Sequence, residues 1–167
     1  PRVGALVDPD VERIFALRPD LVVLYASQDE LRAQLSRAGI ASHAYRHEGL
    51  AEIPATMRRL GTTTGRGATA ERAAAEFERR LAAVRARVAG RPRPRTLLVF
   101  GRDPSSLRNI YASGGTGFLH DGLVAAGGDN VFADVARESV QASAELILAR
   151  APAVIVELRT SELVGGA

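Results

Sequence analysis

The chain contains no lysine and no cysteine, and each absence excludes a class of chemistry. All 22 basic residues are arginines. A Schiff-base lysine and the phosphate-binding lysine of a P-loop are therefore excluded. Because there is no cysteine, the chain has no thiol nucleophile, no thiolate metal site and no disulfide.

Aromatic residues and long apolar runs are also scarce. Aromatics make up 5% of the 167 residues, and the formal net charge is +3. No basic run is interleaved with aromatic residues, so we do not expect nucleic-acid binding. No apolar run approaches the roughly 18 residues of a membrane-spanning helix. The 46% hydrophobic content is typical of a globular chain with one domain or two small ones.

One short pattern occurs twice, at residues 17–24 and 148–156. Each copy has the tail of an amphipathic helix, an arginine, a proline turn and a run of branched apolar residues. Proline ends a helix, and the run that follows is typical of a buried parallel strand. The repetition predicts two lobes of similar construction.

A long stretch between the two copies, residues 68–89, contains no helix-breaking residue. It has one apolar stripe at spacings of four, three and four residues, formed by Phe77, Leu81, Val84 and Val88. This spacing predicts a helix roughly 30 Å long. The helix either covers a single domain or joins two lobes. The proline-rich segment 90–95 favours a boundary there, so we predict lobes at 1–66 and 91–167 joined by a helix at 67–90.

The remaining elements are predicted from caps, turns and periodicity. Asp8 is expected to cap the first helix, and Gly61 to end a helix that begins near Leu50. Further helices are predicted at 116–126 and 139–150, strands at 21–25, 40–45, 96–100 and 154–158, and a long polar loop at 101–113. The alternation of strands and helices predicts an α/β fold with parallel sheets.

Candidate binding residues follow the predicted strands, because ligands of open parallel sheets bind beyond the carboxyl ends of the strands. The glycine-rich tract 111–118 is a second source. Glycines before a helix allow close backbone approach to an anion or carbonyl group, although the same pattern also suits a capped loop. The predicted ligand-binding residues are Tyr25, Ser27, Gln28, Arg46, His47, Arg102, Tyr111, Ser113, Gly114 and Phe118.

The sequence does not point to a catalytic or metal centre. No pair of carboxylates and no Ser/His/Asp arrangement stands out, so no catalytic residue is assigned. The three histidines, His43, His47 and His120, lack metal-ligand spacing. We expect His43 and His120 to serve packing.

Three segments together resemble a known family. They are the start of the chain, Val3-Gly4 with Asp8-Pro9-Asp10-Val11-Glu12 and Leu17-Arg18-Pro19-Asp20-Leu21-Val22, the tract 111–132, and residues 143–152. These resemble the cluster-type periplasmic substrate-binding proteins for cobalamin, haem and iron–siderophores, the helical-backbone metal receptors. The resemblance covers nearly the whole chain.

This resemblance implies two Rossmann-like lobes with short parallel sheets, joined by one long backbone helix. It implies a periplasmic or extracytoplasmic receptor, soluble or lipid-anchored, that delivers ligand to an ABC permease and its ATPase and is not an enzyme. The most similar subgroup is the cobalamin (vitamin B12) binders, in which aromatics at the positions of Tyr25 and Tyr111 flank the corrinoid. By the same resemblance, Glu145 and either Asp29 or Glu30 dock on permease arginines.

The chain departs from this family at both ends, so both lobes are expected to be incomplete. Either the chain is a fragment, or another copy covers the exposed sheet edges by dimerisation or strand exchange.

We predict a receptor for cobalamin or a related corrinoid, with no covalent cofactor. Two alternatives stay open. Arginines near strand ends, Arg46, Arg102, Arg108 and Arg159, favour an iron–siderophore or haem. The other alternative is a small α/β enzyme that acts on nucleotides or sugars.

Overall fold

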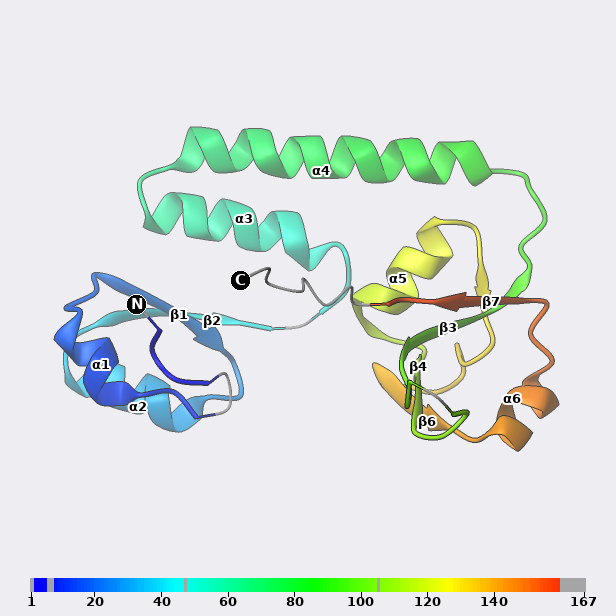
Figure 1. Cartoon of the computed structure of the whole chain (residues 1–167). Helices are drawn as coiled ribbons and strands as arrows, with labels where there is room; N and C mark the ends of the chain where they lie inside the picture. The colour runs from blue at the N-terminus through cyan, green and yellow to red at the C-terminus, as the bar shows by residue number, and fades with distance from the viewer. Residues whose placement is uncertain (1, 6–7, 47, 105, 160–167) are drawn as a thin grey trace, which may run out of the picture. The chain divides into compact units, whose positions relative to one another are not determined.

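The structure is a computed structural model that describes residues 2–5, 8–46, 48–104 and 106–159 (Figure 1). The chain divides into two compact units, unit 1 at residues 1–46 and unit 2 at residues 47–167. The predicted division into lobes at residues 66 and 90 stays a prediction.

Unit 1 is built from two helices and two strands in alternation. The order is α1 (Val11–Ala16), β1 (Leu21–Tyr25), α2 (Asp29–Arg37) and β2 (Ala41–Tyr45). The two strands pair in parallel, from Leu21 opposite Ala41 to Tyr25 opposite Tyr45. The predicted strand–helix–strand arrangement is confirmed here. Its core is formed by Ile14, Leu24, Leu31 and Leu35.

The start of α1 differs from the prediction. Asp10 caps the helix, and its carboxylate accepts the backbone N–H of Arg13 at 3.0 Å. Asp8 instead closes a turn in which its carbonyl accepts the N–H of Ala5 at 3.0 Å. The predicted cap was wrong because this turn holds Asp8 before the helix begins. At the end of α2, Gly39 has a φ of +71°, as expected for a glycine that ends a helix.

Unit 2 begins with two helices, α3 (Glu52–Thr63) and α4 (Gly67–Val88), which lie side by side (Figure 1). The predicted continuous helix is confirmed by α4. The predicted end of α3 at Gly61 is wrong, because the helix continues through this residue. A Cβ on Gly61 would lie 2.2 Å from the Cβ of Ala70. Gly61 therefore allows close approach of α4 rather than ending α3.

The rest of unit 2 is a five-stranded sheet with two further helices. Its elements are β3 (Arg95–Gly101), β4 (Ile110–Ser113), α5 (Gly117–Ala125), β5 (Asp129–Asn130), β6 (Ser139–Ala142), α6 (Ala144–Arg150) and β7 (Val154–Glu157). Strands β5 and β7 run parallel to β3. Strand β4 runs antiparallel to both β3 and β6. The predicted α/β fold is confirmed, but the sheet of unit 2 is mixed rather than parallel throughout, because β4 runs against its two neighbours.

Two segments explain this difference. The predicted polar loop 101–113 ends in β4, where Ile110 and Ala112 are buried on either side of the exposed Tyr111. The turn before β4 is closed by Asp103, whose N–H donates to the carbonyl of Arg108 at 3.1 Å. Residues 139–142, predicted as helix, form β6, and the helix begins only after Ser143.

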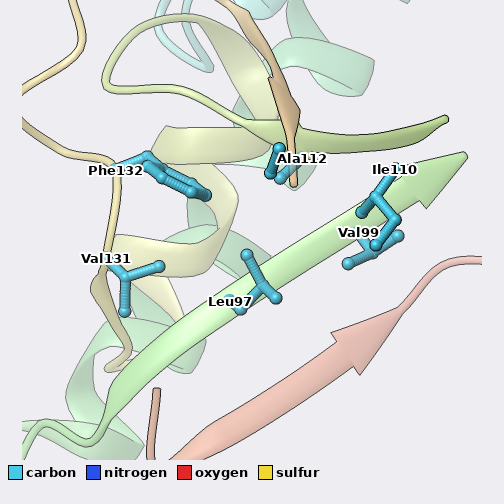
Figure 2. Close-up of a cluster of buried hydrophobic side chains, with 7 residues drawn as sticks. Leu97, Val99, Ile110, Ala112, Val131 and Phe132 are labelled. Carbon is cyan, nitrogen blue, oxygen red and sulfur yellow. The ribbon is translucent and has the colours of Figure 1, made fainter. Parts of the chain in front are cut away.

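The core of unit 2 lies on β3 and β4 and is closed by Phe132, which is fully buried (Figure 2). Leu97 and Val99 of β3 contribute to it. On β7, which pairs with β3, apolar side chains are exposed instead, and Ile155 is 62% exposed. That another copy of the chain covers exposed sheet edges stays a prediction. In the part of the chain that the structure describes, no helix combines the length and apolar character of a membrane span.

Candidate functional site

In unit 1, the end of β1 presents a half-buried aromatic pair. The ring of Tyr25 meets that of its register partner Tyr45 edge to face, with centroids 5.9 Å apart. The side-chain Oε1 of Gln28 accepts the N–H of Tyr25 at 2.9 Å, and the N–H of Gln28 donates back to the Tyr25 carbonyl. Gln28 therefore fixes the backbone that carries Tyr25.

The other predicted residues of unit 1 lie next to this strand end. Ser27, Asp29 and Glu30 are exposed and, with Gln28, line a pocket of about 380 Å³. Asp29 is paired with Arg32 at 2.5 Å. Arg46 is exposed after β2. His47 lies outside the described residues.

In unit 2, aromatic side chains gather around a pocket of about 430 Å³ between the end of β3 and the start of α5. Phe100 and Phe118 line it and are 37% and 41% exposed. Tyr111, 40% exposed, lies beside Phe100 with ring centroids 6.4 Å apart. We call this feature the aromatic pocket; its lining residues are Phe100, Thr116, Gly117, Phe118, Leu119, Glu138 and Ser139. Phe118 was predicted, whereas Phe100 and Glu138 were missed.

The glycine tract packs closely against the segment 133–138. The N–H of Gly114 donates to the carbonyl of Glu138 at 3.0 Å, and the N–H of Gly115 to that of Val135 at 2.8 Å. A Cβ on Gly114 would lie 2.0 Å from the carbonyl oxygen of Arg137. Gly114 is buried, and its close approach is to the segment 133–138.

Ser113 is likewise structural. Its side chain is fully buried, and its hydroxyl donates to the carbonyl of Gly114 at 3.1 Å. Next to it, the buried Asn130 donates from Nδ2 to the same carbonyl at 2.8 Å, and its Oδ1 accepts the N–H of Phe132. Nδ2 of Asn130 also lies 3.1 Å from Nδ1 of His120. These contacts argue against direct ligand contacts by Ser113 and Gly114, and they give His120 the packing role expected of it.

Arg150 holds the segment that follows β5. Its guanidinium donates to both carboxylate oxygens of Asp134, at 2.7 and 2.9 Å, and to the carbonyl of Val131 at 3.1 Å. It also lies over the Phe132 ring, 5.3 Å from the centroid. The Arg150 guanidinium lowers the pKa of the Asp134 carboxyl through their hydrogen bonds.

Arg102, predicted to contact ligand, is engaged within unit 2. Its Nε lies 3.0 Å from Oε1 of Glu157, and it donates to the carbonyl of Asp103 at 3.1 Å. The side chain is mostly buried by these contacts. Arg102 therefore joins the end of β3 to the end of β7, which reduces its availability for an anionic ligand.

Glu145 lies in the first turn of α6. The helix is capped by the Ser143 hydroxyl, which accepts the N–H of Leu146 at 3.1 Å. Glu145 is exposed, and no ion pair involves it among the described residues. In the same helix Leu148 is 78% exposed, and Ile147 packs on the core.

No group of three potential metal ligands occurs among residues 2–5, 8–46, 48–104 and 106–159. His43 lies on β2, and its Nε2 is buried without a hydrogen-bond partner.

Several known proteins are similar to this chain. The family described as "Periplasmic binding protein" matches residues 1–160. A vitamin B12-binding protein of Salmonella typhimurium is 34% identical over 157 residues, which cover 92% of this chain and 57% of that protein. A vitamin B12-binding protein of Yersinia pestis is 30% identical over 149 residues, 88% of this chain and 51% of that protein. The chain thus spans little more than half the length of these relatives.

Solved structures agree on the fold. The periplasmic vitamin B12-binding protein of Vibrio cholerae has a TM-score of 0.77 at 24% identity, over 93% of this chain and 60% of that one. A periplasmic haem-binding protein of Roseiflexus has a TM-score of 0.77 at 27% identity, over 94% of this chain and 60% of that one. With nearly the whole sequence matched by the family, the chain belongs to the periplasmic binding protein family.

Proposed function

We propose that this chain belongs to the substrate-binding component of an ABC importer that captures cobalamin or a related corrinoid. The observation that carries this proposal is the aromatic pocket of unit 2. Phe100 and Phe118 line a space of about 430 Å³, with Tyr111 beside them. Partly exposed aromatic rings suit the apolar faces of a large flat ligand.

Unit 1 supports the same proposal with Tyr25. Its backbone is held by Gln28 and its ring by Tyr45. We propose that Tyr25 and Tyr111 both contact the corrinoid and that Ser27, Gln28 and Arg46 supply polar contacts. The curated relatives named as vitamin B12-binding proteins favour this ligand.

The alternative ligand is haem or an iron–siderophore, and the similarity to a haem-binding protein of Roseiflexus favours it. The ion pair between Arg102 and Glu157 weakens this alternative, because it engages one of the four arginines on which the alternative rests. Absorption spectra of the purified protein, alone and after incubation with cyanocobalamin or haemin and desalting, test the choice. A retained corrinoid spectrum supports the proposal, and retention of haemin alone contradicts it.

The proposed partners are an ABC permease and its ATPase. The proposed location of the whole protein is periplasmic or extracytoplasmic, either soluble or lipid-anchored. Glu145 on α6 and Glu30 on α2 are proposed to dock on permease arginines. Both are exposed acids in the first turn of a helix. Such acids mainly affect the rate at which two proteins associate and the orientation in which they dock, and this effect weakens with salt.

A further inference from the structure

The aromatic pocket contains one charged residue, Glu138. The other residues that line it are aromatic, aliphatic, glycine or hydroxyl-bearing. Glu138 is exposed, and no arginine forms an ion pair with it in the part of the chain that the structure describes. A ligand in this pocket therefore meets an unneutralised carboxylate next to aromatic rings.

The glycine tract fixes the place of this carboxylate. The Glu138 carbonyl accepts the N–H of Gly114 at 3.0 Å. Gly117 has a φ of +85°, and a Cβ there would lie 3.0 Å from Cγ and 3.5 Å from Oε1 of Glu138. The carboxylate thus lies against the start of α5, where unpaired N–H groups and the helix dipole favour a negative charge.

The segment that leads to Glu138 is anchored at its other end. Phe132 is fully buried, and Arg150 holds Asp134 through two hydrogen bonds. The N–H of Gly115 donates to the Val135 carbonyl at 2.8 Å. Glu138 is therefore presented by a fixed segment rather than by a free loop, which reduces the entropy lost when it binds a ligand.

An ionised carboxylate only accepts hydrogen bonds. It attracts a ligand edge that carries amide N–H groups and repels one that carries carboxylates.

We propose that Glu138 is a specificity-determining residue that selects a flat ligand with an amide-bearing edge over one with a carboxylate-bearing edge. This inference rests on the proposed function and specifies the periphery of the ligand that the same pocket accepts.

The test compares two corrinoids with the same ring and different edges, cobinamide with an amide-bearing edge and cobyrinic acid with a carboxylate-bearing edge, together with haemin. Their dissociation constants are measured for the wild type and for Glu138→Gln. Glutamine keeps the shape of the side chain and removes the charge. Glu12→Gln, an exposed glutamate at the start of α1, makes the same change of net charge elsewhere.

We expect the wild type to prefer cobinamide over cobyrinic acid, and Glu138→Gln to reduce this preference about tenfold, the usual scale of one charge-assisted hydrogen bond. Glu12→Gln should leave it unchanged. Corrinoid binding with the same preference in Glu138→Gln would overturn the inference and leave the proposed function standing. Binding of haemin but of neither corrinoid would overturn both the inference and the proposed function. Circular dichroism of each variant confirms that it is folded.

Discussion

Arg58 on α3 donates from Nε and Nη2 to both carboxylate oxygens of Glu71 on α4, at 2.8 and 3.0 Å. The same guanidinium donates to both oxygens of Glu78, two turns further along α4. One arginine thus joins two helices through two carboxylates. Its hydrogen bonds lower the pKa of Glu71 and of Glu78 below their ordinary value of 4.5.

This arrangement predicts a pH dependence of stability. Because both carboxyls have a lower pKa in the folded state, their contribution is present above the ordinary glutamate value and is lost as pH falls through the lowered folded values. Arg58→Gln should lower Tm at neutral pH and flatten the loss of Tm on acidification below about pH 4.5. Thermal unfolding at several pH values checks this. Identical pH profiles for the variant and the wild type would contradict it.

The buried amide of Asn130 predicts a larger effect on stability. Asn130→Ala leaves the Phe132 N–H without its acceptor and the Gly114 carbonyl without one donor, in a buried region. We expect the free energy of unfolding to fall by about 2–4 kcal/mol. Urea unfolding measures it. Gln141→Ala, at an exposed strand position, serves as the control, and an equal loss in both variants would speak against a special role for Asn130.

Two glycines of the same region should respond in opposite directions to alanine. Gly114→Ala brings a Cβ to 2.0 Å from the Arg137 carbonyl oxygen, so we expect a loss of about 2–4 kcal/mol. Gly122 lies within α5, and a Cβ there meets nothing within 4 Å. Gly122→Ala should stabilise the protein by about 0.5–1 kcal/mol. Urea unfolding of both variants tests the assignment of Gly114 to packing, and a neutral Gly114→Ala would refute it.

The docking proposal predicts a separation of function. Glu145→Ala combined with Glu30→Ala should reduce importer-stimulated ATP hydrolysis while ligand affinity stays unchanged, and the reduction should be smaller at high salt. The measurement uses the reconstituted importer at two ionic strengths. Full stimulation by the double variant would leave Glu145 as a residue that only complements the dipole of α6.

Much of the fold was predictable because local signals and tertiary packing agree. Strand β1, with its buried Leu24, follows this rule, whereas α4 was predictable from its apolar stripe although Val84 of that stripe is 41% exposed. The wrong predictions concern segments whose structure is determined by tertiary packing rather than by local sequence. Gly61 matches the sequence pattern of a residue that ends a helix, yet it lies within α3 and allows Ala70 of α4 to approach closely. Segment 139–142 has a helical neighbour, yet it pairs with β4 because Ala142 fills the core.

The candidate site was predictable only in part, for a similar reason. Tyr111 and Phe118 were found from the glycine tract, and the structure places Tyr111 beside Phe100 and puts Phe118 in the aromatic pocket. Glu138 lies about twenty residues after that tract. Its place at the pocket depends on the hydrogen bond from Gly114, a contact that no local pattern reveals. The position of Phe100 at the end of β3 was the available signal for that residue, since strand ends were already the expected ligand side.

The aromatic contact itself can be tested by substitution. Tyr111→Ala should weaken corrinoid binding by about 1–3 kcal/mol, because it removes an exposed aromatic surface that the ligand would cover. Tyr25→Ala is expected to act on the same scale. Tyr111→Phe keeps the ring and should bind nearly as well as the wild type. Unchanged affinity in both alanine variants would remove these residues from the site.

The most direct test of corrinoid capture is calorimetric titration of the purified protein with cyanocobalamin, with haemin titrated in parallel. We expect saturable binding of one cyanocobalamin per chain that is tighter than the binding of haemin. Absence of cyanocobalamin binding by the folded protein, or tighter binding of haemin, would contradict it.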